Sequence, residues 1–350
     1  MARASVRGDL GAGETMEVTF APVALGGAAS LDVVLLLTWS PNEGVLRKWA
    51  SVRLSGDDEP RLLKEVILEN LDVGERRIDW QGDEVQSYPA YTDGFYAGIE
   101  FPIAATRLVK DATGQHLLIA HRPAVKLQPG VWYESRKAVY GVAVPGGEKP
   151  AFEHYVATHR PGPRGLHVNY NSWWTAPEPY YTEADILGLM KTFEEQLYRP
   201  HKVNFDTFCI DMGWSNPKTI WEIDAKLFPQ GFNAIEQGAA SAHAHLGLWI
   251  SPSSQYPTAL DNHWAESSEY ETVMTPWDWR YACLGGPRYR AAFRSHLIEL
   301  VQRYGIRHVK FDGYQFVCYA ANHEHEPGPL SAEACATGII EVFESLLKRR

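Results

Sequence analysis

From the N-terminus to about residue 155, apolar residues come in short runs separated by Gly, Pro and Asp. The runs are MEVTFAPV, LDVVLLLTW, RRIDW, GFYAGIEFP, HLLIAHRPAVKL and KAVYGVAV. Short β-rich runs with turn residues between them are typical of a β-sandwich. Because none of these runs has a convincing helical period, we predict a β-sandwich domain over residues 1–158 with little helix before about residue 155.

The segment 159–165, HRPGPRG, concentrates Pro, Gly and Arg and indicates a linker. After it, apolar strands alternate with amphipathic helices, a pattern that requires a parallel sheet covered by helices. The predicted strands are 167–174, 203–211, 245–251 and 306–312, and the predicted helices are 182–198, 232–244, 253–270, 287–304 and 331–349. The fold class is therefore multidomain β followed by α/β, in which residues 165–350 form the first four βα units of a TIM (β/α)8 barrel.

Polar and aromatic residues recur at the ends of the four predicted parallel strands. In a (β/α)8 barrel the chemistry sits at the carboxyl ends of the strands, and the body of a parallel strand is normally apolar. The residues at these ends are Asn171, Ser172, Trp173 and Trp174; Asp211 and Trp214; Trp249 and Ser251; and Lys310 and Asp312. We predict that they assemble a site strand by strand.

The sharpest chemical signal is Lys310-Phe311-Asp312 at the end of the fourth strand. Strand alternation places Lys310 and Asp312 on one face, so the ammonium is expected beside the carboxylate. That pairing would keep Asp312 ionised, as a nucleophile attacking an anomeric carbon requires. A structural ion pair that closes the strand end explains the same pattern.

A second signal follows the second strand, where Asp211 and Trp214 stand three residues apart. A carboxylate at a strand end can accept hydrogen bonds from two sugar hydroxyls, and a nearby indole can stack on the apolar face of the ring. An Asp that caps the next turn is the alternative interpretation.

Composition narrows the classes of partner. Acidic residues outnumber basic ones by 43 to 33, which gives a formal net charge of −10. No Lys/Arg stripe is present for a nucleic acid backbone, and no apolar run is long enough for a membrane helix. We expect neither nucleic acid nor membrane as a partner. The first residues lack the apolar core of a secretory signal, which favours a cytoplasmic location unless the natural N-terminus is missing.

Six motifs in order carry a resemblance to glycoside hydrolase family 36, the α-galactosidase, melibiase and raffinose synthase group. They are Asn171-Ser172-Trp173-Trp174, Ile210-Asp211-Met212-Gly213-Trp214, Phe228-Pro229-Gln230-Gly231-Phe232, Leu246-Gly247-Leu248-Trp249, Cys283-Leu284-Gly285-Gly286 and Val309-Lys310-Phe311-Asp312. The resemblance covers about residues 165–320. It implies a retaining α-glycosidase that acts on an oligosaccharide or glycoside through a covalent glycosyl-Asp intermediate.

The resemblance also implies a role for each matching residue. Asp312 would be the nucleophile, Lys310 would bind a sugar hydroxyl beside it, and Asp211 would hold the far hydroxyls. The remaining predicted substrate-binding residues are Trp173, Trp174, Trp214, Trp249 and Cys283. The family's acid/base is an Asp well downstream of the nucleophile, so it is expected beyond Arg350.

Two departures from the family pattern change the prediction. Met212 stands where the family often has a second acid, and Ser251-Pro252-Ser253 stands where it has carboxylates, which leaves the identity of the sugar open. Only four of eight βα units are recognisable, so the chain resembles a fragment. The two sheet edges of a half barrel predict association between copies or poor stability.

Other chemistries remain open at this stage. Lys310 could form a Schiff base as in barrel aldolases, with Asp312 as a proton shuttle, or the chain could bind carbohydrate without catalysis. Glu324 or Glu326 is the one substitute acid/base within the chain.

No metal and no cofactor are expected. The segment Asn322-His323-Glu324-His325-Glu326-Pro327 resembles a metal cluster, but its adjacent ligands lack helical i, i+4 spacing, which favours a solvated loop. The four cysteines form no CxxC pair and are typical of small buried residues rather than of a disulfide frame or a zinc site. Two carboxyls suffice for the proton transfers and the covalent step of glycoside hydrolysis.

Overall fold

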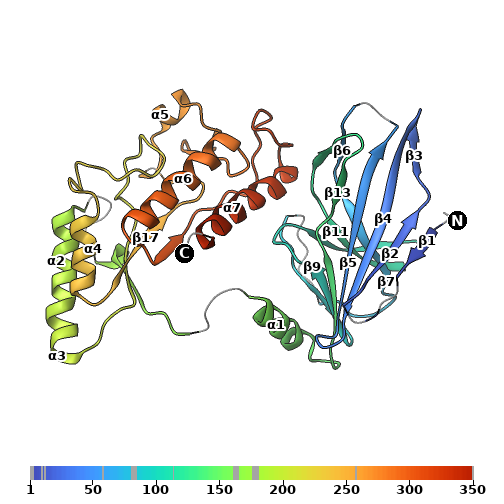
Figure 1. Ribbon diagram of the computed structural model, residues 1–350, viewed down its shortest axis with the longest axis horizontal. Coiled ribbons are helices and arrows are strands. Elements are labelled where there is room, and N and C mark those ends of the chain that lie inside the picture. The colour runs from blue at the N-terminus through green and yellow to red at the C-terminus, as the bar shows by residue number, and fades with distance from the viewer. Residues whose placement is uncertain are drawn as a thin grey trace. The chain divides into compact units, whose positions relative to one another are not determined.

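The computed structural model describes residues 4–8, 11, 13–56, 59–79, 85–112, 114–160, 165–175, 181–256 and 258–348. It divides into two compact units, Met1–Gly162 and Pro163–Arg350 (Figure 1). The boundary lies within the predicted linker 159–165, of which residues 161–164 are outside the described residues.

Unit 1 is built mainly of antiparallel strands. Its largest sheet has the order β1-β2-β4-β5-β14-β9-β8, with β3 added beside β4 and β13 beside β5, and two smaller sheets have the orders β10-β11-β7 and β12-β6. The strands are β1 Ala4–Arg7, β2 Thr15–Phe20, β3 Val23–Gly26, β4 Ala29–Ser40, β5 Val45–Ser55, β6 Arg61–Leu63, β7 Val66–Asp72, β8 Ala90–Thr92, β9 Phe95–Ile99, β10 Ala105–Asp111, β11 Gly114–His121, β12 Val125–Leu127, β13 Trp132–Glu134 and β14 Ala138–Val142.

One helix of unit 1, α1 (Glu148–His159), begins before residue 155, in the region where the sequence predicted little helix. Phe152 and Tyr155 of α1 pack on Tyr96 of the large sheet, with ring centroids 5.5 and 6.1 Å apart. The helix has a single short apolar stripe, because its remaining positions are mostly polar and solvent-exposed. Such a stripe gives little periodic signal in a sequence.

Unit 2 contains a four-stranded parallel sheet of order β15-β16-β17-β20. These strands are β15 Asn169–Asn171, β16 Thr207–Ile210, β17 His245–Ile250 and β20 His308–Phe311, and each lies inside a predicted strand. A short antiparallel hairpin, β18 (Thr272–Met274) with β19 (Arg280–Ala282), precedes α6.

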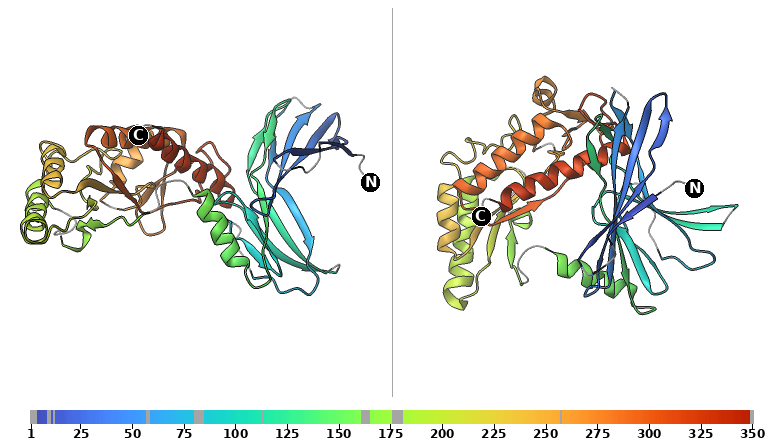
Figure 2. Two further views of the ribbon diagram at one scale, coloured as in Figure 1. Left: turned by 60° about the horizontal axis from the view of Figure 1, so that its bottom comes forward. Right: turned by 45° about the vertical axis from the view of Figure 1, so that its right-hand side comes forward.

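The helices of unit 2 follow the predicted alternation. They are α2 Glu183–Phe193, α3 Arg199–His201, α4 Asn233–Ser241, α5 Asn262–Ser267, α6 Pro287–Arg303 and α7 Ala332–Leu347, with a π-helical turn at Glu194–Tyr198 and 3₁₀ turns at Ser172–Trp174 and Pro329–Ser331. Within this unit α6 and α7 run side by side, as do α2 and α4 (Figures 1 and 2). Most of the predicted helix 253–270 is loop, and among its described residues the helical part is α5.

The parallel sheet has one apolar face, which carries the core of unit 2. Phe208, Ile210, Leu246, Leu248 and Ile250 are buried in a single cluster with the inner side chains of the helices. On β20, Phe311 continues this face and packs on Phe343 of α7 with ring centroids 4.9 Å apart. Alternation along the strands therefore directs the neighbouring side chains to the opposite face.

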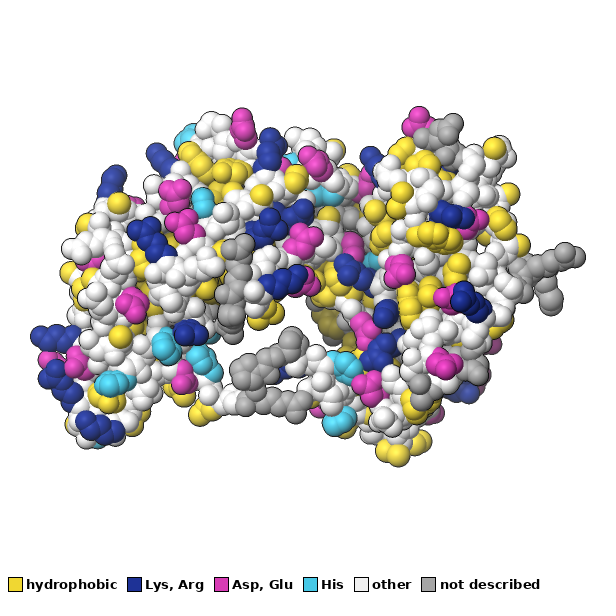
Figure 3. Space-filling view, viewed as in Figure 1, with side chains coloured by type: hydrophobic (Ala, Val, Ile, Leu, Met, Phe, Trp, Pro, Cys, Tyr) yellow, Lys and Arg dark blue, Asp and Glu magenta, His cyan; other side chains and the backbone are white. Residues whose placement is uncertain are grey.

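The surface of the described residues is mixed in charge. On the face seen in Figure 3, Lys and Arg side chains are interspersed with Asp and Glu, with no continuous basic stripe across that face. Among the described helices, none combines the length and the apolar character needed to span a bilayer.

Candidate functional site

The four parallel strands bring Asn171, Asp211, Trp249, Lys310 and Asp312 to the end of the sheet where the strands have their carboxyl termini. In register, Asn171 lies opposite Cys209, Ile210 opposite Leu248, and Trp249 opposite Lys310. All four strands run in the same direction, so their carboxyl ends meet there. Asp211 and Asp312 are the residues that directly follow β16 and β20.

Asp211 is a buried carboxylate with several polar partners. The residue is 2% exposed, and its Oδ2 accepts hydrogen bonds from Asn171 Nδ2 at 2.7 Å and Lys310 Nζ at 2.9 Å. Its Oδ1 accepts from the Met212 amide at 2.9 Å, and its own amide donates to Ser172 Oγ at 2.9 Å. These bonds fix the carboxylate and offset the cost of burying its charge.

Asp312 is half-buried and accepts one hydrogen bond on each carboxylate oxygen. Trp249 Nε1 donates to Oδ2 at 3.3 Å, and the Tyr256 hydroxyl donates to Oδ1 at 3.2 Å. Burial raises the pKa of Tyr256, and the charge of Asp312 raises it further, so the phenol stays a hydrogen-bond donor around neutral pH.

Lys310 does not pair with Asp312 as the strand alternation predicted. Its ammonium reaches across β17 and, among the described residues, forms its ion pair with Asp211. Two residues that share a face of one strand are separated along the pleat, whereas an ion pair across strands brings the two charges to 2.9 Å. The donors to Asp312 are therefore neutral.

The predicted aromatic residues fall into two groups. Trp173 and Trp174 are 38% and 82% exposed. Trp249 is 2% exposed and contacts Asp312, and Trp214, with no exposed surface, donates its Nε1 hydrogen to the Trp249 carbonyl at 2.9 Å. Trp214 thus supports Trp249 from within the core.

Cys283 follows β19 and is also fully buried. Its Sγ lies 3.1 Å from His325 Nε2 and 4.0 Å from Cys335 Sγ. Glu324 and Glu326, the two candidates for a substitute acid/base within the chain, flank His325. Glu324 is exposed and Glu326 is half-buried. Neither glutamate has a described contact with Asp312.

Two tyrosines of the site were missed by the sequence analysis. Tyr256 lies in the loop after β17, and Tyr181 precedes α2 and donates its hydroxyl to the Asp211 carbonyl. Both come from loops, where no periodicity indicates the direction of a side chain. The one signal for Tyr256 is its position five residues after Ser251, in the loop that leaves the carboxyl end of β17.

Solved structures of similar fold cover almost the whole chain. The protein resembles a variant of the GH36 α-galactosidase AgaA from Geobacillus stearothermophilus, solved in complex with 1-deoxygalactonojirimycin, with a TM-score of 0.67 and 14% identity. The similarity covers 96% of this chain and 54% of the AgaA chain. Similar coverage, 99% and 54%, is found with the α-galactosidase from Lactobacillus brevis, with a TM-score of 0.66 and 12% identity. Other structures of AgaA variants contain stachyose or raffinose.

At 12–14% identity these similarities establish the fold alone. The chain spans about half the length of these α-galactosidases. No protein-family model and no curated protein matches the sequence.

Proposed function

We propose that the chain is part of a retaining α-glycosidase of the α-galactosidase type, which hydrolyses terminal α-linked sugars through a covalent intermediate on Asp312. The observation that carries the proposal is the pair of carboxylates at the carboxyl end of the parallel sheet. Asp312 is half-buried and bound by two neutral donors, and Asp211 is buried and bound by Lys310. The shared fold with α-galactosidases supports the same reaction class.

Asp312 has the properties that a nucleophile of this class requires. It is accessible, and the hydrogen bonds from Trp249 and Tyr256 orient its two oxygens. In the first step a carboxylate oxygen attacks the anomeric carbon, the glycosidic bond breaks, and a second carboxyl protonates the leaving oxygen. In the second step that group removes a proton from water, which attacks the same carbon and releases Asp312.

The Asp211–Lys310 pair is proposed to hold the terminal sugar. A carboxylate oxygen accepts and an ammonium donates, so the pair suits two neighbouring hydroxyls, and Asn171 adds an amide beside it. The exposed rings of Trp173 and Trp174 are available for stacking on a sugar. Trp214 and Cys283 are left out of the sugar contacts because both are fully buried.

The architecture of the catalytic unit extends the proposal. We assign the parallel sheet to the first four βα units of a (β/α)8 barrel, and unit 1 to the β-sandwich of residues 1–158. The acid/base would come from a later strand, encoded beyond Arg350, about 5 to 5.5 Å from Asp312. A homo-oligomer is compatible with the open sheet edges.

The test uses the gene read to its natural stop codon and a panel of nitrophenyl α- and β-glycosides that includes the α-galactoside. We expect release of nitrophenol from an α-glycoside and a loss of at least ~1,000-fold in kcat for Asp312→Asn, since a nucleophile is removed. Asp278→Asn, an exposed aspartate in the β18–β19 hairpin, serves as the matched control.

Activity that survives Asp312→Asn, or none on any glycoside, would contradict the proposal. The Schiff-base alternative has its own signature, because borohydride would then trap a carbonyl substrate on Lys310. Lys310 Nζ is held 2.9 Å from the Asp211 carboxylate, whereas attack on a carbonyl needs a free amine. We therefore expect no reduced adduct.

A further inference from the structure

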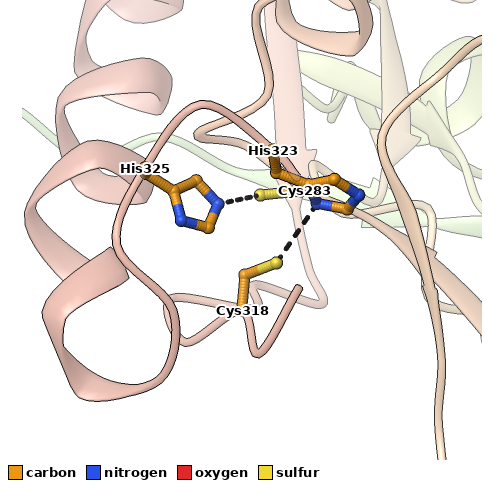
Figure 4. Close-up of side chains that lie close together, drawn as sticks. All are labelled: Cys283, Cys318, His323 and His325. Atoms are coloured by element: carbon orange, nitrogen blue, oxygen red, sulfur yellow. Dashed lines mark hydrogen bonds between the residues drawn. The ribbon is translucent and has the colours of Figure 1, made fainter. Parts of the chain in front are cut away.

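Four metal-ligating side chains converge in unit 2 outside the sugar site. Cys283 follows β19, Cys318 lies after β20, and His323 and His325 belong to the next loop. One ligand atom from each lies within 4.8 Å of every other. Figure 4 shows the rings and sulfurs facing a common centre, with Cys283 Sγ 3.1 Å from His325 Nε2 and Cys318 Sγ 3.3 Å from His323 Nδ1.

We propose that Cys283, Cys318, His323 and His325 bind a structural zinc ion. Two thiolates and two imidazoles are a donor set that zinc prefers, and the tetrahedral geometry places such ligand atoms roughly 3.3 to 3.8 Å apart. The contacts at 3.1 and 3.3 Å are close to this spacing, and because the four ligand atoms lie within 4.8 Å of one another, the more distant pairs need to close by at most about 1 to 1.5 Å. Four protein ligands leave no open position, which makes the site structural rather than catalytic.

The surroundings of His325 hold its ring in a ligating orientation. Its Nδ1 lies 3.0 Å from the Glu326 carbonyl, so the hydrogen on Nδ1 is donated there and the lone pair on Nε2 faces Cys283. A Cβ on Gly285 would lie 2.8 Å from His325 Cδ2, so the glycine provides the space that the ring occupies.

The loop backbone brings the two histidines to the same point. Glu324 between them has φ +62°, the left-handed region that non-glycine residues seldom adopt. His323 is 5% exposed, and the two imidazole rings are nearly perpendicular, at 88°. Local backbone strain of this kind needs compensation from its surroundings, and metal coordination supplies it.

The segment that carries three of the ligands is closed at its base. Gly328 N donates to the Cys318 carbonyl at 2.8 Å, and Cys318 N donates to Ser331 Oγ at 2.7 Å. Tyr281 of β19 donates its hydroxyl to the Val317 carbonyl at 3.2 Å, which links the hairpin to the same segment. The ion would therefore tie the β18–β19 hairpin to the chain that directly follows Asp312.

A disulfide is the competing use of these thiols. Cys335 Sγ of α7 lies 4.0 Å from Cys283 Sγ, and both are fully buried. A disulfide between them would explain one cysteine of the cluster and neither histidine. Zinc accounts for all four side chains, so it is the interpretation that the geometry favours.

The test measures metal in the 350-residue protein purified under reducing conditions without a metal-affinity step. We expect about one zinc ion per chain by mass spectrometry. Replacement by Co²⁺ is expected to give the thiolate-to-cobalt bands of a tetrahedral site. Cys283→Ser and His325→Ala should lose the metal, whereas Cys209→Ser, a buried cysteine on β16 outside the cluster, should keep it.

A second measurement does not depend on whether the variants fold. Removal of zinc from the unmodified protein by a chelator should lower Tm by about 5 °C or more, and added zinc should restore it. The proposal is overturned if the folded protein takes up neither zinc nor cobalt when its thiols are reduced, or if thiol counting shows a Cys283–Cys335 disulfide. These readouts are independent of glycosidase activity.

Discussion

The Asp312 carboxylate accepts one hydrogen bond at each oxygen, and both donors are neutral. Trp249 supplies an indole N–H and Tyr256 a hydroxyl, while the nearby cation, Lys310, is paired with Asp211. A direct ion pair would have to be broken when a carboxylate forms a bond to carbon. Neutral donors orient the oxygens without that cost, which suits a nucleophile.

We expect Trp249→Phe to lower kcat/KM of the proposed glycosidase by roughly tenfold. The substitution keeps an aromatic ring and removes the N–H donor 3.3 Å from Asp312 Oδ2, and a hydrogen bond to a charged group contributes about 1.5 kcal/mol or more. The measurement is the steady-state kinetics of nitrophenyl glycoside hydrolysis, with Tm recorded in parallel.

Trp279→Phe is the matched control for this substitution. The buried Nε1 of Trp279 makes no hydrogen bond among the described residues, so its removal should leave kcat/KM unchanged. Equal losses in the two variants would show that the effect comes from packing and not from the donor at Asp312.

The residues at the carboxyl ends of the parallel strands were predictable because strand ends and strand periodicity are visible in the sequence. Asp211, Lys310 and Asp312 meet for that reason. The predicted partner of Lys310, Asp312, was wrong. Periodicity describes the side chains along one strand, whereas the ion pair of Lys310 with Asp211 joins two strands. Tyr256 and the cluster of Cys283, Cys318, His323 and His325 depend on how loops fold, which no spacing of residues encodes.

Two glycines of the Cys283-Leu284-Gly285-Gly286 motif have separate steric roles. A Cβ on Gly285 would meet His325, and a Cβ on Gly286 would lie 2.5 Å from Glu271 Cβ and Cγ. In the sequence, this motif stood out only because it resembles a motif of glycoside hydrolase family 36. The structure explains it by the close approach of one ring and one carboxylate side chain.

At the scale of elements, the long amphipathic helices were the most predictable. The stripe of Phe293, Leu297 and Leu300 is buried on α6, as its helical period indicates. The helix α1 was missed and the helix 253–270 was overestimated, because short or loop-rich segments carry weak periodicity.

The N-terminus of α6 is capped by the carboxylate of Glu271, the residue directly before β18. Glu271 is 3% exposed and accepts from the Tyr289 amide at 2.8 Å and from Arg288 Nε at 2.9 Å. Burial opposes ionisation, but these hydrogen bonds outweigh it and lower the pKa of Glu271 from its ordinary value of 4.5. The positive end of the helix dipole adds to the same effect.

We expect Glu271→Gln to reduce the free energy of unfolding by about 1 to 3 kcal/mol at pH 7. Because the pKa of Glu271 is lower in the folded state, its stabilisation is present above the unfolded-state value near 4.5 and is lost as pH falls through the folded-state pKa. Urea unfolding at several pH values measures this difference.

The exposed neighbour Glu269 provides the control. Glu269→Gln should change stability by less than about 0.5 kcal/mol at any of these pH values. A deficit of Glu271→Gln that did not shrink in acid would show that charge at the helix terminus is not its cause.

At the scale of the whole molecule, the parallel sheet has two open edges among the described strands. β15 pairs only with β16, and β20 pairs only with β17. Unpaired strand edges are templates for pairing with another chain. The 350-residue chain is therefore expected to associate as its concentration rises through the micromolar range, which light scattering during gel filtration measures.

A charged residue added to β20 should weaken this association. His308→Lys places an ammonium on the edge strand, next to Lys310, and we expect it to shift the protein toward the monomer. Arg294→Lys on the exposed side of α6 should not. A chain that stays monomeric at all concentrations would show that its sheet edges are protected.

Asp312 directly follows an edge strand, so the groups on its two sides come from different strands. One flank, with Trp249 and the Asp211–Lys310 pair, belongs to the strands already present. On the proposed function, the other flank would be formed by the strand that pairs with β20 in the complete barrel. If the chain acts as proposed, recognition of the donor sugar and choice of the acceptor depend on different strands, so we expect exchange of the strands beyond β20 between related enzymes to convert hydrolysis into sugar transfer while the bond-breaking step stays the same.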